Sequence, residues 1–489
     1  MILALLCAAI PFASDSLRLP PVPREFRGVW VATVGNIDWP SRAGLPVEQQ
    51  QDELLAILDR AQAVHLNAVI LQVRPAGDAF YESQIEPWSE WLTGKQGRAP
   101  SPKWDPLAFA VTEAHARGIE LHAWFNPFRA KISGPVAELS PLHIARRYPS
   151  LAKRYGKLLW MDPGDERVRQ HVLRVVLDVV KRYDVDGVHI DDYFYPYPEH
   201  ERGELVQFAD DESYSRYRHA GGSLPRDDWR RENVDKLVKA LYDGIHELKP
   251  WVKFGISPFG IYRPGFPAGT EGMDTYAELF ADARKWLNEG WADYFSPQLY
   301  WPLGLQAQNF RALLEWWGGE NKFNRHIWPG LGTYKVGTRD WPAIEVVSQI
   351  MATRADKTAT GDVHYSMHPL LVNQGGIVDQ LTTRVYDGPA LVPESPWLPG
   401  ETPRAPRIRF VQDGTDRVQA CFGDTTLANP RWWVLYVKRD TAWTARVLPG
   451  AVRRMALGAL GPRDSVALSA VDRTGRQGGV TVATSAPRC

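Results

Sequence analysis

Short runs rich in apolar and β-branched residues alternate with longer stretches of helical periodicity from Arg27 to about Met367. This alternation constrains the fold of the chain, because it is typical of β–α–β units with parallel strands. The predicted strands are Gly28–Thr33, Ala68–Val73, Glu120–Phe125, Gly187–Asp191, Lys253–Ser257, Tyr294–Leu299, Ile327–Leu331 and Val363–Ser366. Eight such strands with intervening helices predict a (β/α)₈ TIM barrel, with an open doubly wound sheet as the alternative. No G-x-G-x-x-G motif follows the first strand, which argues against a dinucleotide-binding sheet.

The stretches between the predicted strands carry apolar residues at helical spacing. In Val47–Val64 these are Leu54, Leu55, Ile57, Leu58, Ala61 and Val64, which form a helical stripe. The other predicted helices are Pro106–Arg117, Glu166–Tyr183, Trp229–Leu248, Tyr276–Glu289 and Ala343–Ala355.

The composition shifts after the eighth predicted strand. Prolines crowd the segment 386–406, which predicts a linker or a wrapped arm. Beyond it, β-rich runs at Arg407–Val411, Trp433–Lys438, Ala445–Leu448 and Ser465–Asp472 predict a small β-sandwich of the fibronectin type III kind. We therefore expect a signal-peptide remnant or disordered tail at 1–24, a catalytic barrel at 25–385, the linker at 386–406 and the sandwich at 407–489.

Charge and aromatic content narrow the class of ligand. Lys and Arg total 57, as do Asp and Glu, so no net charge attracts a phosphate polyanion and nucleic acid is not an expected partner. The chain holds 20 Trp, 18 Tyr and 17 Phe, many beside Pro or Gly in apparent loops, where rings stack on apolar faces of a ligand. A polysaccharide is therefore the expected substrate, whereas protein partners stay unknown.

The amino-terminal segment resembles a targeting signal. Its apolar stretch Ile2–Ile10 is too short to span a bilayer, so we expect no transmembrane span. A signal-peptide remnant indicates export to the periplasm or cell envelope, although the basic residues usual before such a stretch are absent.

The fourth predicted strand carries the strongest catalytic candidate. In a barrel of this type the active site lies at the carboxyl ends of the strands. Alternation places His189 and Asp191 on the face that points into the barrel, so Asp191 is expected at its mouth, where a retaining glycosidase has its nucleophile. The alternative is that Asp191 or Asp192 caps a helix or forms a structural ion pair.

The loop after the second strand offers the other acids. Glu86, slightly ahead of Asp78, is our candidate for the acid/base carboxyl, and Glu271 and Asp274 of the fifth loop are held in reserve. Asp192 is expected to orient a sugar hydroxyl or to raise the pKa of a neighbour through like-charge repulsion.

Further residues at the strand ends are expected to bind the sugar. His122 is as consistent with a core group as with a ligand contact. The predicted substrate-binding residues are Trp30, Arg74, Trp88, His122, Trp124, Asn126, Arg129, His189, Tyr193, Tyr195, Gln298, Tyr300, Trp301 and Tyr334.

Ordered motifs along 25–373 resemble the glycosyl-hydrolase-like 10 family. They are Arg27-Gly28-Val29-Trp30, Gln72-Val73-Arg74-Pro75, Glu86-Pro87-Trp88-Ser89, His122-Ala123-Trp124-Phe125-Asn126-Pro127, the run from Asp186 to Pro196, Ser257-Pro258-Phe259-Gly260 and Pro297-Gln298-Leu299-Tyr300-Trp301. The resemblance implies a bacterial, exported (β/α)₈ glycoside hydrolase, often a lipoprotein, that cleaves peptidoglycan glycan strands, particularly strands stripped of peptide stems.

The segment from Asp186 to Asp191 also resembles the fourth-strand motif of α-amylase-type barrels. That resemblance implies that Asp191 rather than Asp192 is the nucleophile. Those barrels place a glutamate acid/base after the fifth strand, where this chain has Ser257-Pro258-Phe259, so the acid must come from another loop or the mechanism differs.

Together these observations predict a glycoside hydrolase with a carboxylate pair at the barrel mouth and no cofactor or catalytic metal. Two alternatives stay open: a carbohydrate-binding protein on a hydrolase scaffold, and a metal-dependent polysaccharide deacetylase using His122, His189 and Asp191.

Overall fold

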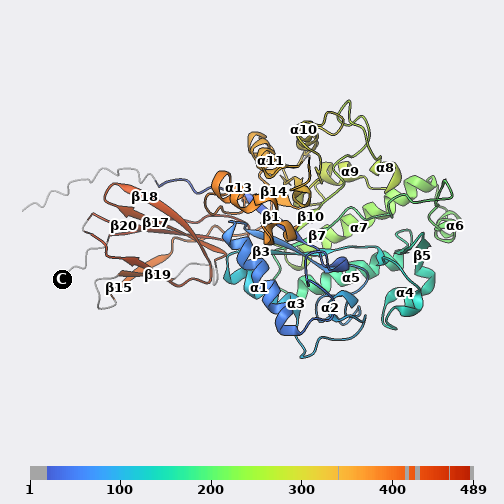
Figure 1. The fold of residues 1–489 in the computed structure, drawn as a ribbon, viewed down its shortest axis with the longest axis horizontal. Helices are drawn as coiled ribbons and strands as arrows, with labels where there is room; N and C mark the ends of the chain where they lie inside the picture. Colours follow the sequence, from blue (N-terminus) through green and yellow to red (C-terminus); the bar gives the residue numbers. More distant parts are fainter. Residues whose placement is uncertain (1–18, 340, 413–417, 424–429, 462, 485–489) are drawn as a thin grey trace, which may run out of the picture.

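The computed structural model of the chain describes residues 19–339, 341–412, 418–423, 430–461 and 463–484. The predicted signal remnant falls almost wholly outside these residues. The described chain forms a TIM-barrel-like part joined to a smaller all-β part, which lie end to end along the long axis of the molecule (Figure 1). Within the described residues, no helix combines the length and the apolar character needed to cross a membrane.

A parallel sheet forms the centre of the larger part. In the described chain it has nine strands: β1 (Phe26–Val31), β2 (Ala68–Arg74), β3 (Glu120–Phe125), β7 (Gly187–Ile190), β10 (Lys253–Ile256), β11 (Tyr294–Phe295), β12 (His326–Ile327), β13 (Gly330–Leu331) and β14 (Gly361–His364). Their spatial order is β12-β11-β10-β7-β3-β2-β1-β14-β13. The two end strands, β12 and β13, are consecutive in the chain, so the sheet curves back towards itself.

The predicted strands agree with this sheet except at the sixth and seventh. The expected run Ile327–Leu331 is split between β12 and β13 by Trp328 and Pro329. Pro329 has no N–H to donate to a neighbouring strand, which accounts for the interruption. β11 also ends four residues before the predicted Leu299.

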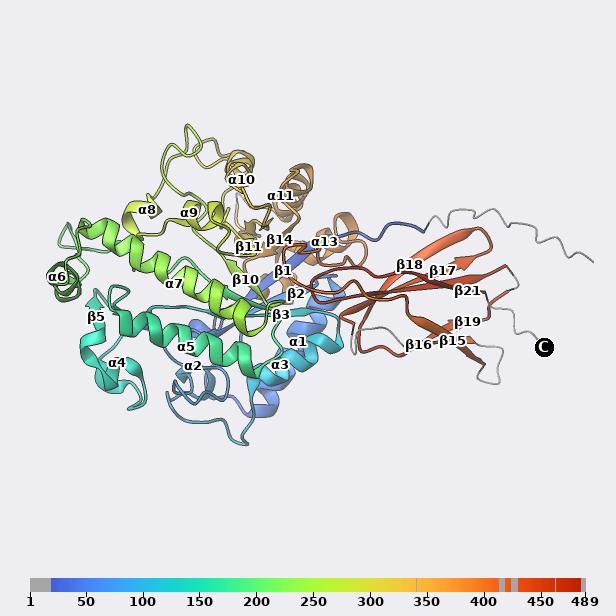
Figure 2. The ribbon, with the colours of Figure 1, turned by 180° about the vertical axis from the view of Figure 1, so that it is seen from behind.

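Helices cover the outside of the sheet (Figure 2). The longer ones are α1 (Val47–Ala63), α3 (Pro106–Ala116), α5 (Glu166–Arg182), α7 (Arg226–Leu248), α10 (Phe310–Gly319), α11 (Ala343–Ala355) and α13 (Ile377–Arg384). α5 shows why they form: Asp165 accepts a hydrogen bond from the Arg167 amide at its start, and its buried valines recur at helical spacing. The predicted helix Tyr276–Glu289 is wrong, because α8 (Thr275–Glu278) and α9 (Ala283–Asn288) replace it and Asp282 caps the second.

Shorter helices and strands lie within the loops at the carboxyl ends of the strands. They are α2 (Glu90–Thr93), β4 (Arg129–Lys131), α4 (Ile144–Arg147), β5 (Ala152–Tyr155), β6 (Leu158–Met161), β8 (His200–Glu201), β9 (Glu204–Leu205), α6 (Asp211–His219) and α12 (Met367–Leu371). In Figure 1 α4, β5 and α6 lie at the end of the molecule farthest from the all-β part.

The carboxyl-terminal part consists of two antiparallel sheets. One contains β15 (Arg407–Gln412), β16 (Val418–Gly423) and β19 (Arg454–Gly458), and the other β18 (Ala442–Pro449), β17 (Trp432–Arg439), β20 (Ser465–Val471) and β21 (Thr481–Thr484). Phe422, Trp433, Leu435 and Leu468 pack between the sheets as a small core. The predicted β-sandwich strands are therefore present, and β16, β19 and β21 are additional.

This β-part packs against the amino ends of the barrel strands. The Trp432 indole donates to the carbonyl of Gly118, just before β3, at 2.7 Å. Arg431 pairs with the buried Asp186, which precedes β7. The segment after α13 also contacts this end, since the Trp397 indole donates to Asp293 at 2.8 Å. In a barrel of this type, residues at the amino ends of the strands serve stability, whereas the active site lies at the carboxyl ends.

We predict that Trp432→Ala lowers the free energy of unfolding by about 3–5 kcal/mol, because a buried indole and its packing are lost. Trp432 is 2% exposed and belongs to one apolar cluster with Phe26 of the barrel part and Leu391 of the segment that follows it. Denaturant unfolding followed by far-UV circular dichroism measures the change. As a control, Tyr148→Ala removes a ring that is 51% exposed and should change stability by less than about 0.5 kcal/mol. Equal effects of the two substitutions would contradict the packing described here.

Candidate active site

A cavity of about 170 Å³ opens at the carboxyl ends of the barrel strands. Its lining comes from the ends of β1, β3, β7, β10, β11 and β14, far apart in the sequence. The lining residues are Trp30, Trp124, Asp191, Asp192, Tyr193, Tyr197, Ser257, Gln298, Tyr300 and Tyr365. The cavity thus combines aromatic rings with two adjacent carboxyl groups and, among its described lining residues, holds no Lys or Arg.

Asp191 follows β7 directly and is held by donors from β3 and the turn after it. The Trp124 indole donates to its Oδ2 at 3.1 Å, and the Asn126 amide donates to both carboxyl oxygens at 3.1 and 3.2 Å. The Tyr193 backbone N–H donates to Oδ1 at 3.3 Å. Burial raises the pKa of Asp191, while Arg129 and these hydrogen bonds oppose the rise. The donors favour the ionised, acceptor-only form of the carboxylate.

The pKa of Asp192 is raised, which favours its protonated form. Burial, together with the neighbouring charge of Asp191, raises the pKa of Asp192 to about 6, although hydrogen bonds from Tyr197 and Gln298 oppose the rise. The Tyr197 hydroxyl donates to Asp192 Oδ2. A pair of carboxyl groups whose pKa values are pushed apart is the arrangement that acid–base chemistry needs. Asp192 is therefore the residue of the pair with the larger upward pKa shift.

Aromatic rings form the walls of the cavity. Tyr300 and Tyr365 stack with centroids 5.8 Å apart, and Tyr365 meets Trp30 edge-on at 6.1 Å. On the other side Tyr193 meets Tyr197 at 5.3 Å. Rings fixed by one another present rigid apolar faces, on which the C–H faces of a pyranose stack.

Two histidines support the floor of the cavity from inside the barrel. His189 contacts the Trp30 indole N–H at 3.1 Å and the Ser257 hydroxyl at 3.0 Å, and it shares the Tyr294 hydroxyl with His122. Burial, reinforced by the nearby His122, holds the pKa of His189 well below its usual value, so its ring is neutral. Alanine at position 187 would bring its Cβ within 2.5 Å of His122 Nδ1, which explains the glycine there. Both histidines therefore position other groups and do not line the cavity.

The acids of the second loop lie elsewhere. Glu86 pairs with Arg74 at 2.6 Å and His171 at 2.7 Å, with both partners of the Arg74–Glu86 pair fully buried. Although burial opposes the change, Arg74 and His171 lower the pKa of Glu86 to about 2. Asp78 accepts from the Ala76 amide and from Gln96, and burial raises its pKa to about 7. Neither carboxyl lines the cavity, so the structure does not bring them together with Asp191.

Comparison with known proteins identifies the family of the chain. The family model for glycosyl hydrolase-like 10 matches residues 25–343. Glycosyl hydrolase YngK of Bacillus subtilis is 41% identical over 426 residues, covering 84% of this chain and 81% of that protein. This chain belongs to the glycosyl hydrolase-like 10 family. The hydrolase also matches glycosyl hydrolase DigH of Escherichia coli K12, at 35% identity over 68% of this chain and 81% of that protein.

Family membership confirms the resemblance found in the sequence and identifies the chain as a glycoside hydrolase. Among solved structures, the PgaB (BpsB) glycoside hydrolase domain from Bordetella bronchiseptica aligns with a TM-score of 0.48 at 13% identity, covering 75% of this chain and all of that one. The catalytic domain of β-amylase from Paenibacillus polymyxa aligns with a TM-score of 0.47 at 10% identity, covering 75% of this chain and 99% of that one.

The other predicted residues of the hydrolase are not among those that line the cavity. Arg129 lies over the Tyr193 ring at 4.8 Å and donates to the Pro75 carbonyl at 2.9 Å. Trp301 packs against Phe259. The ring centroid of Tyr334 lies 5.9 Å from that of the lining residue Tyr300, and Tyr334 is 45% exposed. Trp88 lies half-buried in the second loop, Asp274 caps α8, and Glu271 is exposed.

Three of the lining residues are not among those predicted from the sequence. Tyr197 stands in the same aromatic run as Tyr193 and Tyr195, and Tyr365 lies within the predicted eighth strand, so position alone would have identified both. Ser257 ends the fifth strand, where its hydroxyl contacts His189. In the described part of the chain, no group of three or more His, Cys, Asp or Glu side chains is arranged to hold a metal ion.

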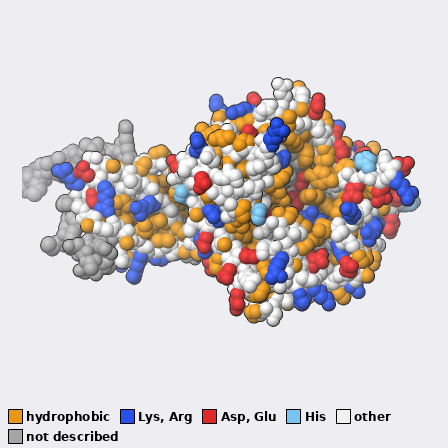
Figure 3. Space-filling view, viewed as in Figure 1, with side chains coloured by type: hydrophobic (Ala, Val, Ile, Leu, Met, Phe, Trp, Pro, Cys, Tyr) orange, Lys and Arg blue, Asp and Glu red, His pale blue; other side chains and the backbone are white. Residues whose placement is uncertain are grey.

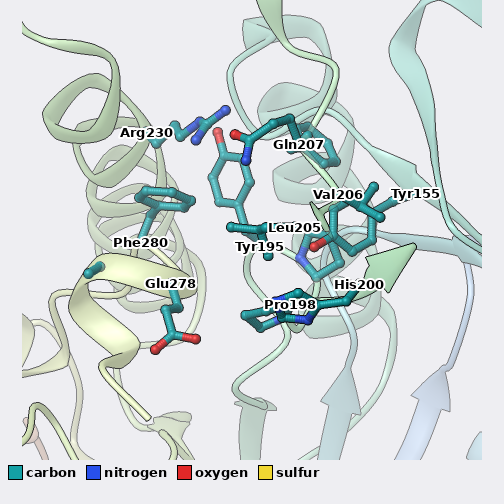
Figure 4. A pocket seen from close by; sticks show the side chains of 13 residues that line it. Tyr155, Tyr195, Pro198, His200, Leu205, Val206, Gln207, Arg230, Glu278 and Phe280 are labelled. Carbon is teal, nitrogen blue, oxygen red and sulfur yellow. The ribbon is translucent and has the colours of Figure 1, made fainter. Parts of the chain in front are cut away.

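A second cavity of about 250 Å³ lies beyond the segment Tyr193–Pro198 (Figure 4). This segment separates the two spaces, since Tyr193 and Tyr197 line the first whereas Tyr195 lines the second. Figure 4 shows the Tyr195 side chain directed towards Arg230 and Gln207, with Phe280 alongside. On the face of the molecule seen in Figure 3, acidic and basic side chains are interspersed.

We predict that Glu86→Gln destabilises the protein by about 3–5 kcal/mol, because the buried Arg74 charge loses its partner. The native pKa of Glu86, about 2, lies below that of the unfolded chain, so its stabilisation is present at neutral pH and is lost as pH falls from about 4 towards 2. Denaturant unfolding at pH 7 and pH 3 measures this, and the difference between parent and variant should shrink at pH 3.

Glu82→Gln is the matched control, because Glu82 lies in the same loop in an exposed pair with Lys103. An exposed pair contributes about 0–1 kcal/mol, so this variant should unfold like the parent. A Glu86→Gln protein with parental stability but no hydrolysis would instead restore Glu86 as the acid/base.

Proposed function

We propose that this glycoside hydrolase cleaves glycosidic bonds in bacterial cell-wall glycan, with peptidoglycan strands stripped of peptide stems as its substrate. The observation that carries the proposal is the adjacent pair Asp191 and Asp192 in an aromatic-walled cavity at the barrel mouth. The motifs shared with the glycosyl-hydrolase-like 10 family support the choice of substrate. The rings suit the stacked pyranoses of a glycan strand.

The two aspartates divide the chemistry between them in this proposal. Asp192 holds a proton below about pH 6 and donates it to the glycosidic oxygen as the bond to C1 breaks. Asp191 stays ionised and stabilises the positive charge that develops on the sugar. This assignment moves the acid role from Glu86 and Asp78 to Asp192.

The location and the domain scheme of the enzyme are also proposed. The apolar stretch Ile2–Ile10 supports export to the periplasm or cell envelope. The boundaries 25–385, 386–406 and 407–489 are retained, with the middle segment packed against the barrel rather than extended from it. The order β15-β16-β19 facing β18-β17-β20-β21 supports a sandwich of the fibronectin type III kind.

We predict that Asp191→Asn and Asp192→Asn each reduce hydrolysis by at least about 100-fold while the protein stays folded, because each removes a group acting on the reacting bond. Mass spectrometry of saccharides released from purified, amidase-stripped glycan strands measures the effect. Glu82→Gln is the control with parental activity. Strands that bind to the parent protein without any release would favour the carbohydrate-binding alternative, and full activity of either aspartate variant would reject its role.

The pH dependence offers an independent test of Asp192. An acid must be protonated to act, so kcat/KM should fall as pH rises through about 6. The hydrogen bond from Tyr197 lowers the pKa of Asp192, so Tyr197→Phe should move this alkaline limb to higher pH. The exposed Tyr148→Phe is the control and should leave the profile unchanged. If the fall of kcat/KM with rising pH occurs at the same pH in Tyr197→Phe as in the parent, a group other than Asp192 is responsible for it.

A further inference from the structure

We propose that the enzyme supplies no nucleophile of its own and instead uses the 2-acetamido group of an N-acetylhexosamine, which Asp191 orients while Asp192 acts as acid and base. This inference rests on the proposed function and defines the substrate class more closely: the sugar whose C1 bond is broken must carry a 2-acetamido group.

The first observation is that both carboxyl groups come from one strand end. In a retaining glycosidase with a protein nucleophile, the acid and the nucleophile flank the sugar on different sides, about 5 Å apart. Here Asp191 and Asp192 are consecutive residues after β7. The walls contributed by the ends of β10, β11 and β14 present Ser257, Gln298, Tyr300 and Tyr365. Among the described lining residues, no carboxyl group stands on those walls.

The second observation is that the other buried acids near the mouth already have partners. Asp38 accepts hydrogen bonds from the Ser366 hydroxyl at 2.7 Å and from the amides of His368 and Ala32 at 2.8 Å each. Glu86 is held by Arg74 and His171, and neither acid lines the cavity. A carboxylate in such a network cannot reach an anomeric carbon without breaking buried ion pairs or hydrogen bonds.

The surroundings of Asp191 suit an amide N–H. An ionised carboxylate has about four lone-pair sites and donates nothing, so it takes an N–H as readily as its present donors. Trp124 and Asn126 fix its orientation, which keeps it from swinging towards C1 as a nucleophile must. The rings of Trp30, Trp124 and Tyr365 line the same cavity and provide the apolar surface that an acetyl methyl group requires.

The reaction balances with water as the only co-reactant. The acetamido carbonyl oxygen forms a bond to C1 as the bond from C1 to the glycosidic oxygen breaks, and the Asp192 proton passes to that leaving oxygen. The resulting oxazolinium ion keeps its N–H on Asp191, whose negative charge it faces. Asp192, now ionised, then takes a proton from a water molecule as the water oxygen attacks C1. The ring opens, the acetamido group is restored, and the anomeric configuration is retained.

The test uses matched substrates and the full chain. Amidase-stripped glycan strands are de-N-acetylated with base, and separate portions are re-acylated with acetyl or trifluoroacetyl groups. Trifluoroacetylation withdraws electrons from the attacking carbonyl, so kcat/KM should fall by about 100-fold or more, and the free-amine strands should resist cleavage. Proton NMR of the first products should show retention.

An inhibitor gives a readout that does not depend on turnover. A thiazoline fused to the glucosamine ring resembles the oxazolinium ion and should inhibit the enzyme competitively. Its affinity, measured by calorimetry, should fall at least about tenfold in Asp191→Asn, because the carboxylate facing the ring nitrogen is lost. Glu82→Gln should bind it as the parent does.

The outcomes separate the two proposals. If none of the acylated strands is cleaved, the proposed function fails. If acetylated and trifluoroacetylated strands are cleaved at equal rates, or if the product is inverted, the enzyme is a glycan hydrolase but the acetamido group is not its nucleophile.

Discussion

The buried ion pair between Arg74 and Glu86 holds the active-site end of the barrel together. Arg74 ends β2, and its guanidinium binds Glu86 on one side and the carbonyls of Asn126 and Pro127 on the other. It therefore fixes the turn after β3, from which the Asn126 amide reaches Asp191. A buried charge tolerates little displacement because an unpaired ion costs several kcal/mol, so the turn has one arrangement. A salt bridge that does not itself line the cavity thus helps to set the position of the Asp191 carboxylate.

The ring beneath the cavity that is closest to its lining residues, that of His189, is uncharged. His122 and His189 share the Tyr294 hydroxyl, and His189 stays uncharged because of its burial. Burial and the neighbouring charge of Asp191 raise the pKa of Asp192, while Arg129 opposes the rise that burial causes at Asp191. In the proposed mechanism Asp191 faces the positive charge that develops on the sugar, so the pair of carboxyl groups complements the transition state.

The sequence was informative where periodicity and topology decide position, and uninformative where tertiary contacts do. Alternation along β7 correctly predicted that Asp191 reaches the mouth, because a parallel strand in a closed or nearly closed sheet has a defined inner face. The partner of Glu86 was not predictable, since nothing in the loop shows that it folds back onto Arg74, twelve residues earlier. The continuous helix expected at Tyr276–Glu289 failed for a similar reason: apolar spacing persists through a break in which Phe280 adopts a left-handed conformation and Asp282 caps a new helix.

The contacts with the β-part and the cavity with the two aspartates lie at opposite ends of this barrel. Arg431 and Trp432 of the β-part engage the amino ends of the strands, while Asp191 and Asp192 follow a carboxyl end. The loops at the carboxyl ends of the strands supply aromatic rings to the cavity. Among the described lining residues, they supply no carboxyl group opposite Asp192. If the acetamido group is the nucleophile, as we propose, the site gains specificity from its mechanism, since a sugar without a 2-acetamido group lacks the reacting atom itself. Discrimination by a missing nucleophile exceeds what one hydrophobic contact provides, which is about 1–3 kcal/mol. In that proposal the tyrosine walls need only to hold the glycan in place, because the chemistry selects the sugar.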